Sequence, residues 1–459
     1  MSEQKAELSS ARINKIGLFH LGSGMADVLA TGVWNRIMIS DLGYSATVVG
    51  FLAALRYFLA PLGIWAGRIS DSRVVGGYRR LFWIGTGRGL MVMSTFALGL
   101  ATAQLARTPG QSTTMLWGVI IVAMVLFSIG NAFSGGTFLA LIYDRTPNHQ
   151  RGRVVGIVWT WLLVGFTVGG IFFGLLLPEH KEGATGLSFS PDALQNLFIL
   201  AGLMFAALWG MAMWGEERRT VSGALQNAQA SEPLSLRADL RLVWQNRTMR
   251  TFLIFLSFSM FFAFSQDAVL EPFAGDVFKM AAAQTNRFAG YWGSMSILGT
   301  LLFLWLSRRY PRLTSTLMSQ IGVTLLIVSF VIFGVSSLGQ IRPLVTPGLI
   351  VLGAGLGVWN VGALGLMMTL SPSGRAGTFL GFWTMVVTLT RGGGVASGGV
   401  VRDVLLALSG QFSVAYGAVF IVGAVGLGVS LWALNQMNVK AFESETVIES
   451  RTILVAAMD

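Results

Sequence analysis

The chain of 459 residues contains no cysteine and only three histidines. The missing cysteines exclude disulfides, Cys-ligated zinc and iron–sulfur clusters. His20, His149 and His180 lie too far apart in the sequence to suggest a metal site. No Ser/His/Asp group or phosphate-binding loop can be recognised either. We therefore expect neither a metal centre nor an enzyme.

Charged residues are also scarce, at 12% of the chain against roughly 25% in a soluble protein. Hydrophobic residues make up 53% and gather in long runs. A membrane-spanning helix needs about 20 mostly apolar residues. Twelve runs reach this length and predict an all-α membrane protein with spans at 16–39, 45–66, 81–104, 114–140, 153–177, 194–214, 249–271, 288–306, 314–338, 345–369, 377–401 and 411–434.

The longest polar interruption, 215–248, divides the chain into six plus six spans. The halves also repeat one another, since Trp159-Thr160 and Trp383-Thr384 lie 224 residues apart, as do Arg151 and Arg375. Two repeated six-helix halves are typical of transporter architectures. We predict an N-terminal segment (1–15), a first bundle (16–214), a central loop (215–248), a second bundle (249–434) and a tail (435–459).

The basic residues predict the orientation in the membrane. If both ends of the chain are cytosolic, 22 of the 32 lysines and arginines fall in cytosolic segments and six on the opposite side. Cytosolic loops of membrane proteins carry such an excess. We therefore expect both termini in the cytosol. The net charge of +11 needs no nucleic-acid partner to explain it.

The predicted loop after the second span reads GRISDSRVVGGYRR. It resembles the G-x-L-x-D-R-x-G-R-R loop of the major facilitator superfamily, with Gly67, Asp71, Arg79 and Arg80 matching and about four extra residues. The resemblance implies a cytosolic gate. Gly67 is expected to allow close helix packing, and Asp71 to pair with a loop arginine or to meet a helix N-terminus. Such contacts would hold the two halves together on the cytosolic face. The alternative is a plain basic loop facing the cytosol.

Ionisable residues inside a bilayer are costly and are candidates for function. The first span carries His20, Asp27, Asn35 and Arg36. At 1.5 Å per residue, Asp27 lies near the midplane, and Arg56 in the second span falls at a similar depth. We therefore predict an Asp27–Arg56 ion pair between the first two spans.

The seventh span ends in SQDAVLEPF. Asp267 and Glu271 are spaced i,i+4, which places them on one helix face, and Pro272 is expected to end or kink the helix. Arg391 in the eleventh span lies at a depth that allows contact with Asp267. For all these charges, a purely structural ion pair is as good an explanation as a ligand contact. Arg88 is expected to extend toward the cytosol.

His20 has two readings. A neutral imidazole in an apolar helix can ligate the magnesium of a chlorin, as an axial histidine ligates haem iron. Alternatively, the imidazole only forms a hydrogen bond with a neighbouring helix.

Three stretches carry a closer resemblance: GLFHLGSGMADVLATGVWNRIMISDLG, LRYFLAPLGIWAGRISDSRVVGGYRR and QDAVLEPFAGDVFKMAAAQTNRFAGYW. Together they resemble the PucC-type family of phototrophic bacteria, also called the bacteriochlorophyll delivery family, a branch of the major facilitator superfamily. Asn35-Arg36 and Leu270 to Phe273 are its most specific marks. The LRYFLAP stretch is similar to members encoded among bacteriochlorophyll synthesis genes.

The resemblance implies a factor for assembly of light-harvesting complexes in the cytoplasmic or intracytoplasmic photosynthetic membrane. Its partners would be lipid, antenna polypeptides and bacteriochlorophyll, carried as cargo rather than as a tightly bound cofactor, or the pigment-synthesis enzymes. Two other readings stay open. One is a proton-coupled transporter using Asp27, Asp267 or Glu271. The other is a scaffold for pigment-synthesis enzymes. The oligomeric state is left open.

Overall fold

A computed structural model describes residues 7–108, 113–177, 187–217, 241, 243–310, 312–371 and 376–437, and every structural statement below refers to them. For residues 148 and 376–380 only the backbone is described. Much of the predicted central loop and of both terminal segments lies outside these ranges, as does Arg375. Every predicted span corresponds to a helix or to a pair of successive helices.

The first six spans form the N-terminal half. The first consists of α1 (Ser10–Val28) continued by two π-helical stretches, Leu29–Trp34 and Ile37–Asp41, and the second of α2 (Ala46–Phe58) and α3 (Pro61–Ser72). The remaining four are α4 (Leu81–Arg107), α5 (Thr114–Arg145), α6 (Arg151–Leu176) and α7 (Pro191–Met213).

The C-terminal half begins with a broken helix made of α9 (Arg247–Ala263) and α10 (Leu270–Phe278). The short α11 (Ala282–Thr285) precedes α12 (Phe288–Arg309). The bundle is completed by α13 (Ser315–Leu338), α14 (Val345–Thr369), α15 (Ala376–Ser409) and α16 (Phe412–Asn435).

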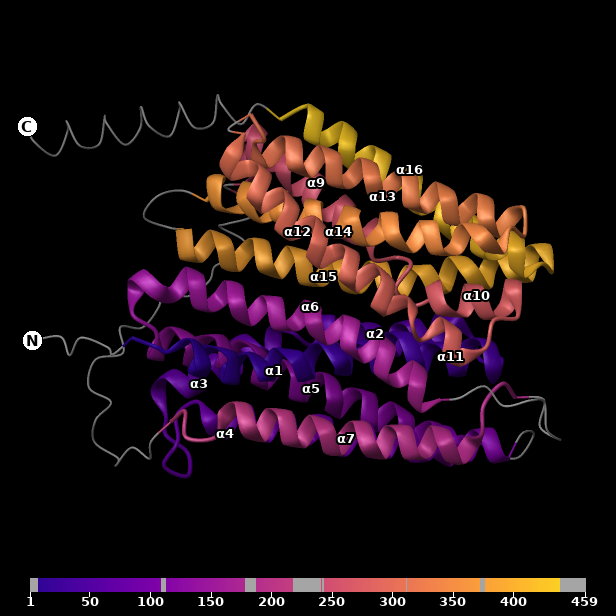
Figure 1. Cartoon of the computed structure of the whole chain (residues 1–459), viewed down its shortest axis with the longest axis horizontal. Coiled ribbons are helices and arrows are strands. Elements are labelled where there is room, and N and C mark those ends of the chain that lie inside the picture. Colours follow the sequence, from indigo (N-terminus) through magenta and orange to yellow (C-terminus); the bar gives the residue numbers. More distant parts are fainter. Residues whose placement is uncertain are drawn as a thin grey trace, which may run out of the picture.

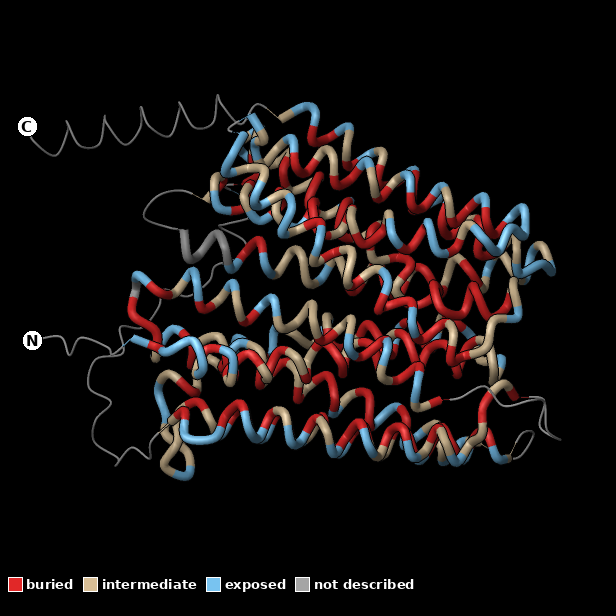
Figure 2. Tube along the Cα trace, in the orientation of Figure 1, coloured by how far each residue is buried: buried red, intermediate tan, exposed pale blue. Residues whose placement is uncertain are grey.

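Ten described helical segments are long and apolar enough to cross a membrane. The other two predicted spans correspond to α9 with α10 and to α15. Many large apolar side chains on these helices are exposed, such as Leu175, Leu203 and Val425. Buried and exposed positions follow one another along the helices (Figure 2). Such an exposed apolar surface suits lipid. The predicted all-α membrane fold is confirmed.

The two halves lie side by side with their helices running along the long axis of the molecule (Figure 1). Each half has its own apolar core. They meet mainly through α2 against α15 and α6 against α12. A Cβ atom added at Gly170 would lie 2.6 Å from the backbone nitrogen of Gly290, so glycine is required for this close approach.

The start of α1 and the end of α16 lie at the same end of the bundle (Figure 1). We call this the basic end, because the turns at residues 73–80 and 145–150 lie there and contain arginines. The opposite end, which carries residues 42–45, 279–287 and 339–344, is called the distal end.

The segment around Gly67 departs from the prediction in two ways. Helix α3 continues to Ser72, so the connection is shortened to residues 73–80, where Val75 and Tyr78 exchange backbone hydrogen bonds of 2.9 and 3.0 Å. Gly76 and Gly77 form this turn at φ values of 61° and 85°, which glycine adopts without strain. A Cβ at Gly67 would meet no atom within 4 Å, so the predicted close packing there is wrong.

Candidate functional site

Four charged side chains meet between the two halves near the middle of the bundle. Arg56 of α2 donates a hydrogen bond to Asp27 of α1. On the C-terminal side of the interface, Arg391 of α15 forms an ion pair of 3.2 Å with Asp267. The Nη2 of Arg391 also lies 4.0 Å from the Oδ2 of Asp27, across the interface. Both predicted pairs are confirmed. The cluster joins the halves and contains two positive and two negative groups.

Aromatic rings and amides surround this central cluster. The Tyr57 hydroxyl accepts a hydrogen bond of 2.9 Å from Arg56, and the guanidinium of Arg391 lies 3.9 Å from the ring centroid of Phe264. Cations held over aromatic faces gain electrostatic attraction in a desolvated site. Gln266 donates to the Asp267 carboxylate at 2.6 Å, and Asn35 to the Asp267 carbonyl at 3.2 Å. The prediction that Asn35 belongs with these charges is consistent with this geometry.

Asp267 reaches the cluster because the seventh span is broken. Residues 264–269 form turns between α9 and α10. A proline at position 272 cannot donate to the carbonyl of Ala268, but it is tolerated in the first turn of a new helix. Pro272 therefore lies in the first turn of α10, and the expected kink near this residue is confirmed as a break just before it. The expected i,i+4 face shared by Asp267 and Glu271 is wrong, because Asp267 lies in the break and Glu271 in α10.

Glu271 lies in the first turn of α10, with 5% of its surface exposed. It forms no ion pair with a described residue. Its Oε1 faces the first span, 3.6 Å from the position that a Cβ would take on Gly32. Glu271 is thus a buried carboxyl group at the interface of the halves, separate from the paired charges.

Arg36 lies toward the distal end instead of in the central cluster. It pairs with Asp41 at 2.5 Å and donates to the carbonyl of Met280 at 2.9 Å. Since Met280 belongs to the C-terminal half, Arg36 helps to join the halves at this end.

A distal network, which the sequence did not suggest, completes the junction. Asp276 of α10 accepts hydrogen bonds from Ser40 at 2.5 Å, Arg402 at 2.9 Å and Tyr416 at 2.6 Å. All three groups of the Asp276–Arg402–Tyr416 trio are buried. Arg402, which directly follows the predicted eleventh span (377–401), lies within α15.

Asp403 binds the other half at a helix end. Its carboxylate accepts hydrogen bonds from the Ser45 hydroxyl at 2.6 Å and from the backbone nitrogens of Ala46 and Thr47 at 3.2 and 2.8 Å. These backbone groups begin α2 and have no partner within the helix. A carboxylate here also interacts favourably with the helix dipole. In the sequence, the only feature that pointed to this contact was the Arg402-Asp403 pair near the predicted end of the eleventh span.

The predicted gate loop makes its ion pairs within the N-terminal half. Asp71 pairs with Arg79 at 3.1 Å and with Arg80 at 2.5 Å, and Arg80 also reaches Asp144 at 3.0 Å. The Glu217 carboxylate accepts the backbone N–H groups of residues 79–81 at 2.7 to 3.2 Å. The Asp71–arginine pairing is confirmed, whereas gating stays a prediction.

His20 is buried among the rings of Phe19, Phe138 and Trp159, whose centroids lie 5.6, 5.1 and 5.3 Å from its own. Neither ring nitrogen has a described hydrogen-bond partner. Arg88 lies between the rings of Phe19 and Trp209, at 4.0 and 4.5 Å from their centroids. It is buried, so the expectation that it extends to the membrane surface is wrong.

The class of protein follows from the fold. A bacterial homologue of the human lysosomal transporter Spinster, solved in an inward-facing and unoccupied conformation, aligns over 98% of this chain and 98% of its own with a TM-score of 0.67 and 15% identity. The chain has the major facilitator superfamily fold. No group of metal-ligating side chains is found within the described residues.

The sequence comparison identifies the family. The profile described as "PUCC protein" matches residues 33–442, so the chain belongs to the PucC family. Protein PucC of Rhodovulum sulfidophilum is 28% identical over 402 residues, which are 86% of each chain. The "bacteriochlorophyll synthase 44.5 kDa chain" of Rhodobacter capsulatus is 28% identical over 413 residues, covering 89% of this chain and 91% of that protein.

Proposed function

We propose that the protein is an assembly factor for light-harvesting complexes that binds bacteriochlorophyll and delivers it to antenna polypeptides in the membrane. The observation that carries the proposal is the PucC-family match over residues 33–442. The name of one relative contains bacteriochlorophyll synthase, which associates the family with this pigment. We ascribe no enzymatic step to this chain.

The geometry of the central cluster supports an apolar cargo. Asp27 and Asp267 are neutralised by Arg56 and Arg391, so the cluster has no net formal charge to offer a charged solute. Aromatic residues surround it, including Tyr57 and Phe264. A flat, largely apolar macrocycle is recognised by such side-chain packing with few polar contacts.

We further propose that the basic end faces the cytosol of a phototrophic bacterium, in the cytoplasmic or intracytoplasmic photosynthetic membrane. The distribution of lysine and arginine supports this orientation. Reporter fusions to residues 73–80 and 339–344 should report opposite sides, with the first inside.

Pigment binding is tested by purification from a phototrophic host and, as a control, from the same host with pigment synthesis blocked. The expected result is a preparation from the first host that absorbs at bacteriochlorophyll wavelengths and carries antenna peptides. Deletion of the gene should lower the number of antenna complexes per reaction centre. A colourless preparation together with unchanged antenna content would refute the proposal.

His20 is a candidate ligand for the pigment magnesium, since both ring nitrogens lack a described partner. The three surrounding rings would have to move to admit a macrocycle. We expect His20→Phe to shift the absorption band of co-purified pigment if ligation occurs. Retention of the same band would remove this role and leave pigment binding by packing intact.

A second function, proton-coupled transport, is favoured by Glu271. This buried carboxyl group has no described cationic partner and lies between the halves, where a proton carrier would act. Glu271→Gln would then abolish solute uptake in vesicles and fail to complement the deletion strain. An assembly factor should tolerate this substitution. Asp192→Asn, which changes an exposed carboxylate at the distal end, serves as the matched control.

A further inference from the structure

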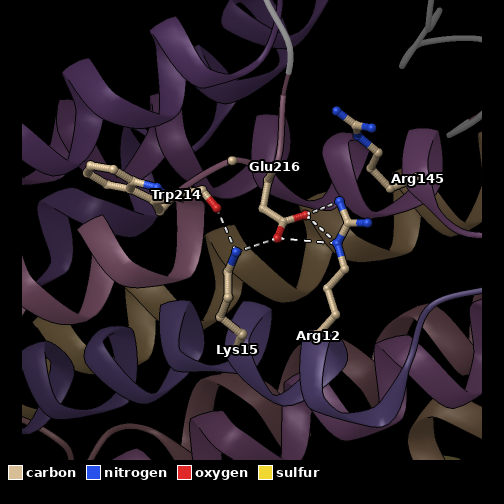
Figure 3. Close-up of a pocket in the computed structure, with 6 residues that line it drawn as sticks. Arg12, Lys15, Arg145, Trp214 and Glu216 are labelled. Atoms are coloured by element: carbon tan, nitrogen blue, oxygen red, sulfur yellow. Dashed lines mark hydrogen bonds and ion pairs between the residues drawn. The ribbon is translucent and has the colours of Figure 1, made fainter.

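A cavity of about 510 Å³ lies at the basic end of the N-terminal half. Arg12 and Lys15 of α1, Arg145 at the end of α5, and residues 214–216 after α7 line it (Figure 3). Arg12 precedes Asp27 by 15 residues, or about 22 Å along a helix at 1.5 Å per residue, so the cavity is distinct from the central cluster.

The cavity contains more positive charge than its single carboxylate neutralises. Glu216, whose side chain is only 1% exposed, lies 2.8 Å from both the Nη2 of Arg12 and the Nζ of Lys15. Arg145 forms no hydrogen bond or ion pair with a described residue, and the Nη1 of Arg12 also makes no described hydrogen bond. Three cations and one carboxylate leave a formal excess of two positive charges and unused N–H donors.

The cationic groups are held in position by the chain that follows α7. Lys15 donates to the carbonyl of Trp214 at 2.6 Å. Gly215, at a φ of 69°, turns the backbone so that Glu216 reaches back to α1. Arg12 also lies in the first turn of α1, where the N-terminus of the helix adds positive potential. Binding an anion here would require little reorganisation.

Trp214 indicates the depth of the cavity in the membrane. It directly follows the spanning helix α7 and is 81% exposed. Tryptophan gathers at the level of lipid headgroups. The cavity therefore opens where phosphate groups of phospholipids are found.

We propose that this cavity binds a phosphate group, provided either by the headgroup of an anionic phospholipid or by a free phosphate ion. Planar guanidinium groups match phosphate oxygens with paired, charge-assisted hydrogen bonds. An ordinary basic loop lacks the buried carboxylate that positions two of the cations.

The test uses the full-length protein, purified in detergent and delipidated, with native mass spectrometry to count bound molecules. Phosphatidylglycerol and phosphatidylcholine are titrated separately, and inorganic phosphate is added as a competitor. We expect Arg145→Gln to weaken phosphatidylglycerol binding about tenfold, as expected for loss of a charge-assisted hydrogen bond. Arg308→Gln is the matched control, because Arg308 is an exposed arginine of the C-terminal half at the same end.

Each outcome decides the proposal. Selective loss in Arg145→Gln without competition by millimolar phosphate assigns the site to a lipid headgroup, and competition by phosphate assigns it to the free ion. Equal losses in both variants indicate general attraction to the basic end and overturn the proposal, as does unchanged binding in Arg145→Gln. If Arg145→Gln lowers the thermal midpoint of unfolding, Arg145→Lys is used in its place. We expect this variant to weaken phosphatidylglycerol binding only about threefold, because it keeps the positive charge and removes only the planar guanidinium group.

Discussion

The two ends of the bundle use their charged residues differently. At the distal end, Asp276 and Asp403 of the C-terminal half bind Ser40 and the start of α2 in the N-terminal half. At the basic end, the pairs formed by Arg80 and by Glu216 lie within the N-terminal half. The hydrogen bonds and ion pairs described between the halves thus lie from the central cluster to the distal end.

This difference teaches where the two halves are joined and where they can move. Separation of the halves at the distal end would remove the hydrogen bonds that Asp276 and Asp403 accept from Ser40 and from the start of α2. It would also remove the bond from Arg36 to the Met280 carbonyl. Each lost hydrogen bond costs about 1 kcal/mol, although the ion pairs within each half remain. Charges at the basic end keep their partners whatever the C-terminal half does. Separation of the halves would therefore break described polar contacts at the distal end and none at the basic end.

The largest expected effect is the loss of Asp276, which would leave Arg402 and Tyr416 buried with their shared acceptor missing. We expect Asp276→Ala to lower the free energy of unfolding by about 3 to 5 kcal/mol, because the donors Ser40, Arg402 and Tyr416 each lose an acceptor. Arg402 keeps its ion pair of 2.8 Å with Asp403. Thermal unfolding in detergent measures the change. Asp192→Ala, which breaks the exposed pair with Arg107, should cost about 0 to 1 kcal/mol. Equal effects of the two variants would contradict the distinction between buried and exposed pairs.

The central cluster should show strong coupling between its members. Asp27→Ala or Arg56→Ala alone should each cost about 2 to 4 kcal/mol, reduced from a fully buried pair because Asp27 is a quarter exposed. The double variant should cost less than the sum, since it leaves neither charge unpaired. Simple additivity in this cycle would show that the two side chains do not interact.

Two glycines of α3 differ in their surroundings: Gly63 lies in a close contact between helices, and Gly67 lies at an open position. A Cβ at Gly63 would lie 2.6 Å from the carbonyl oxygen of Ala132 on α5, whereas at Gly67 it would meet nothing within 4 Å. Gly63→Ala should therefore destabilise the protein by about 1 to 3 kcal/mol. Gly67→Ala should be neutral or stabilise the helix by up to about 1 kcal/mol. A loss of stability in Gly67→Ala would restore the packing role that the motif implied.

The smallest effect is expected at the basic end. Glu217→Ala removes a carboxylate that accepts backbone N–H groups at the start of α4, a contribution of about 1 kcal/mol for a capping group. Hydrogen exchange at residues 79–81 should become faster, while exchange in α15 stays the same. Faster exchange in both would mean that this contact also holds the two halves together.

Hydropathy was sufficient to predict the all-α membrane fold and the positions of its long helices, ten of which, within the described residues, can cross a membrane. Each span must satisfy its backbone hydrogen bonds internally over a nearly fixed apolar length, which makes the pattern easy to recognise. Depth along two antiparallel helices was also sufficient to pair Asp27 with Arg56. The kink of the seventh span near Pro272 was predicted, but the position of the break at residues 264–269 was not. A proline interrupts the hydrogen bond one turn before itself, and the local pattern stays apolar across the break.

The distal network and the position of Arg88 could not be predicted from one sequence. Asp276 meets Arg402 and Tyr416 through contacts between residues more than 100 positions apart. Arg88 is stabilised by two rings from other helices, and no local signal distinguishes this from a side chain that reaches the surface. The family resemblance also implied a role for Gly67 that its surroundings in this chain do not support.

The adjacent residues Glu216 and Glu217 fasten the end of the first bundle to two different helices, α1 and the start of α4. The chain then continues toward the second bundle. The end of the first bundle is therefore fastened at two points, so the loss of either contact leaves Glu216 and Glu217 attached through the other. A force applied to the chain beyond Glu217 would be shared by both helices.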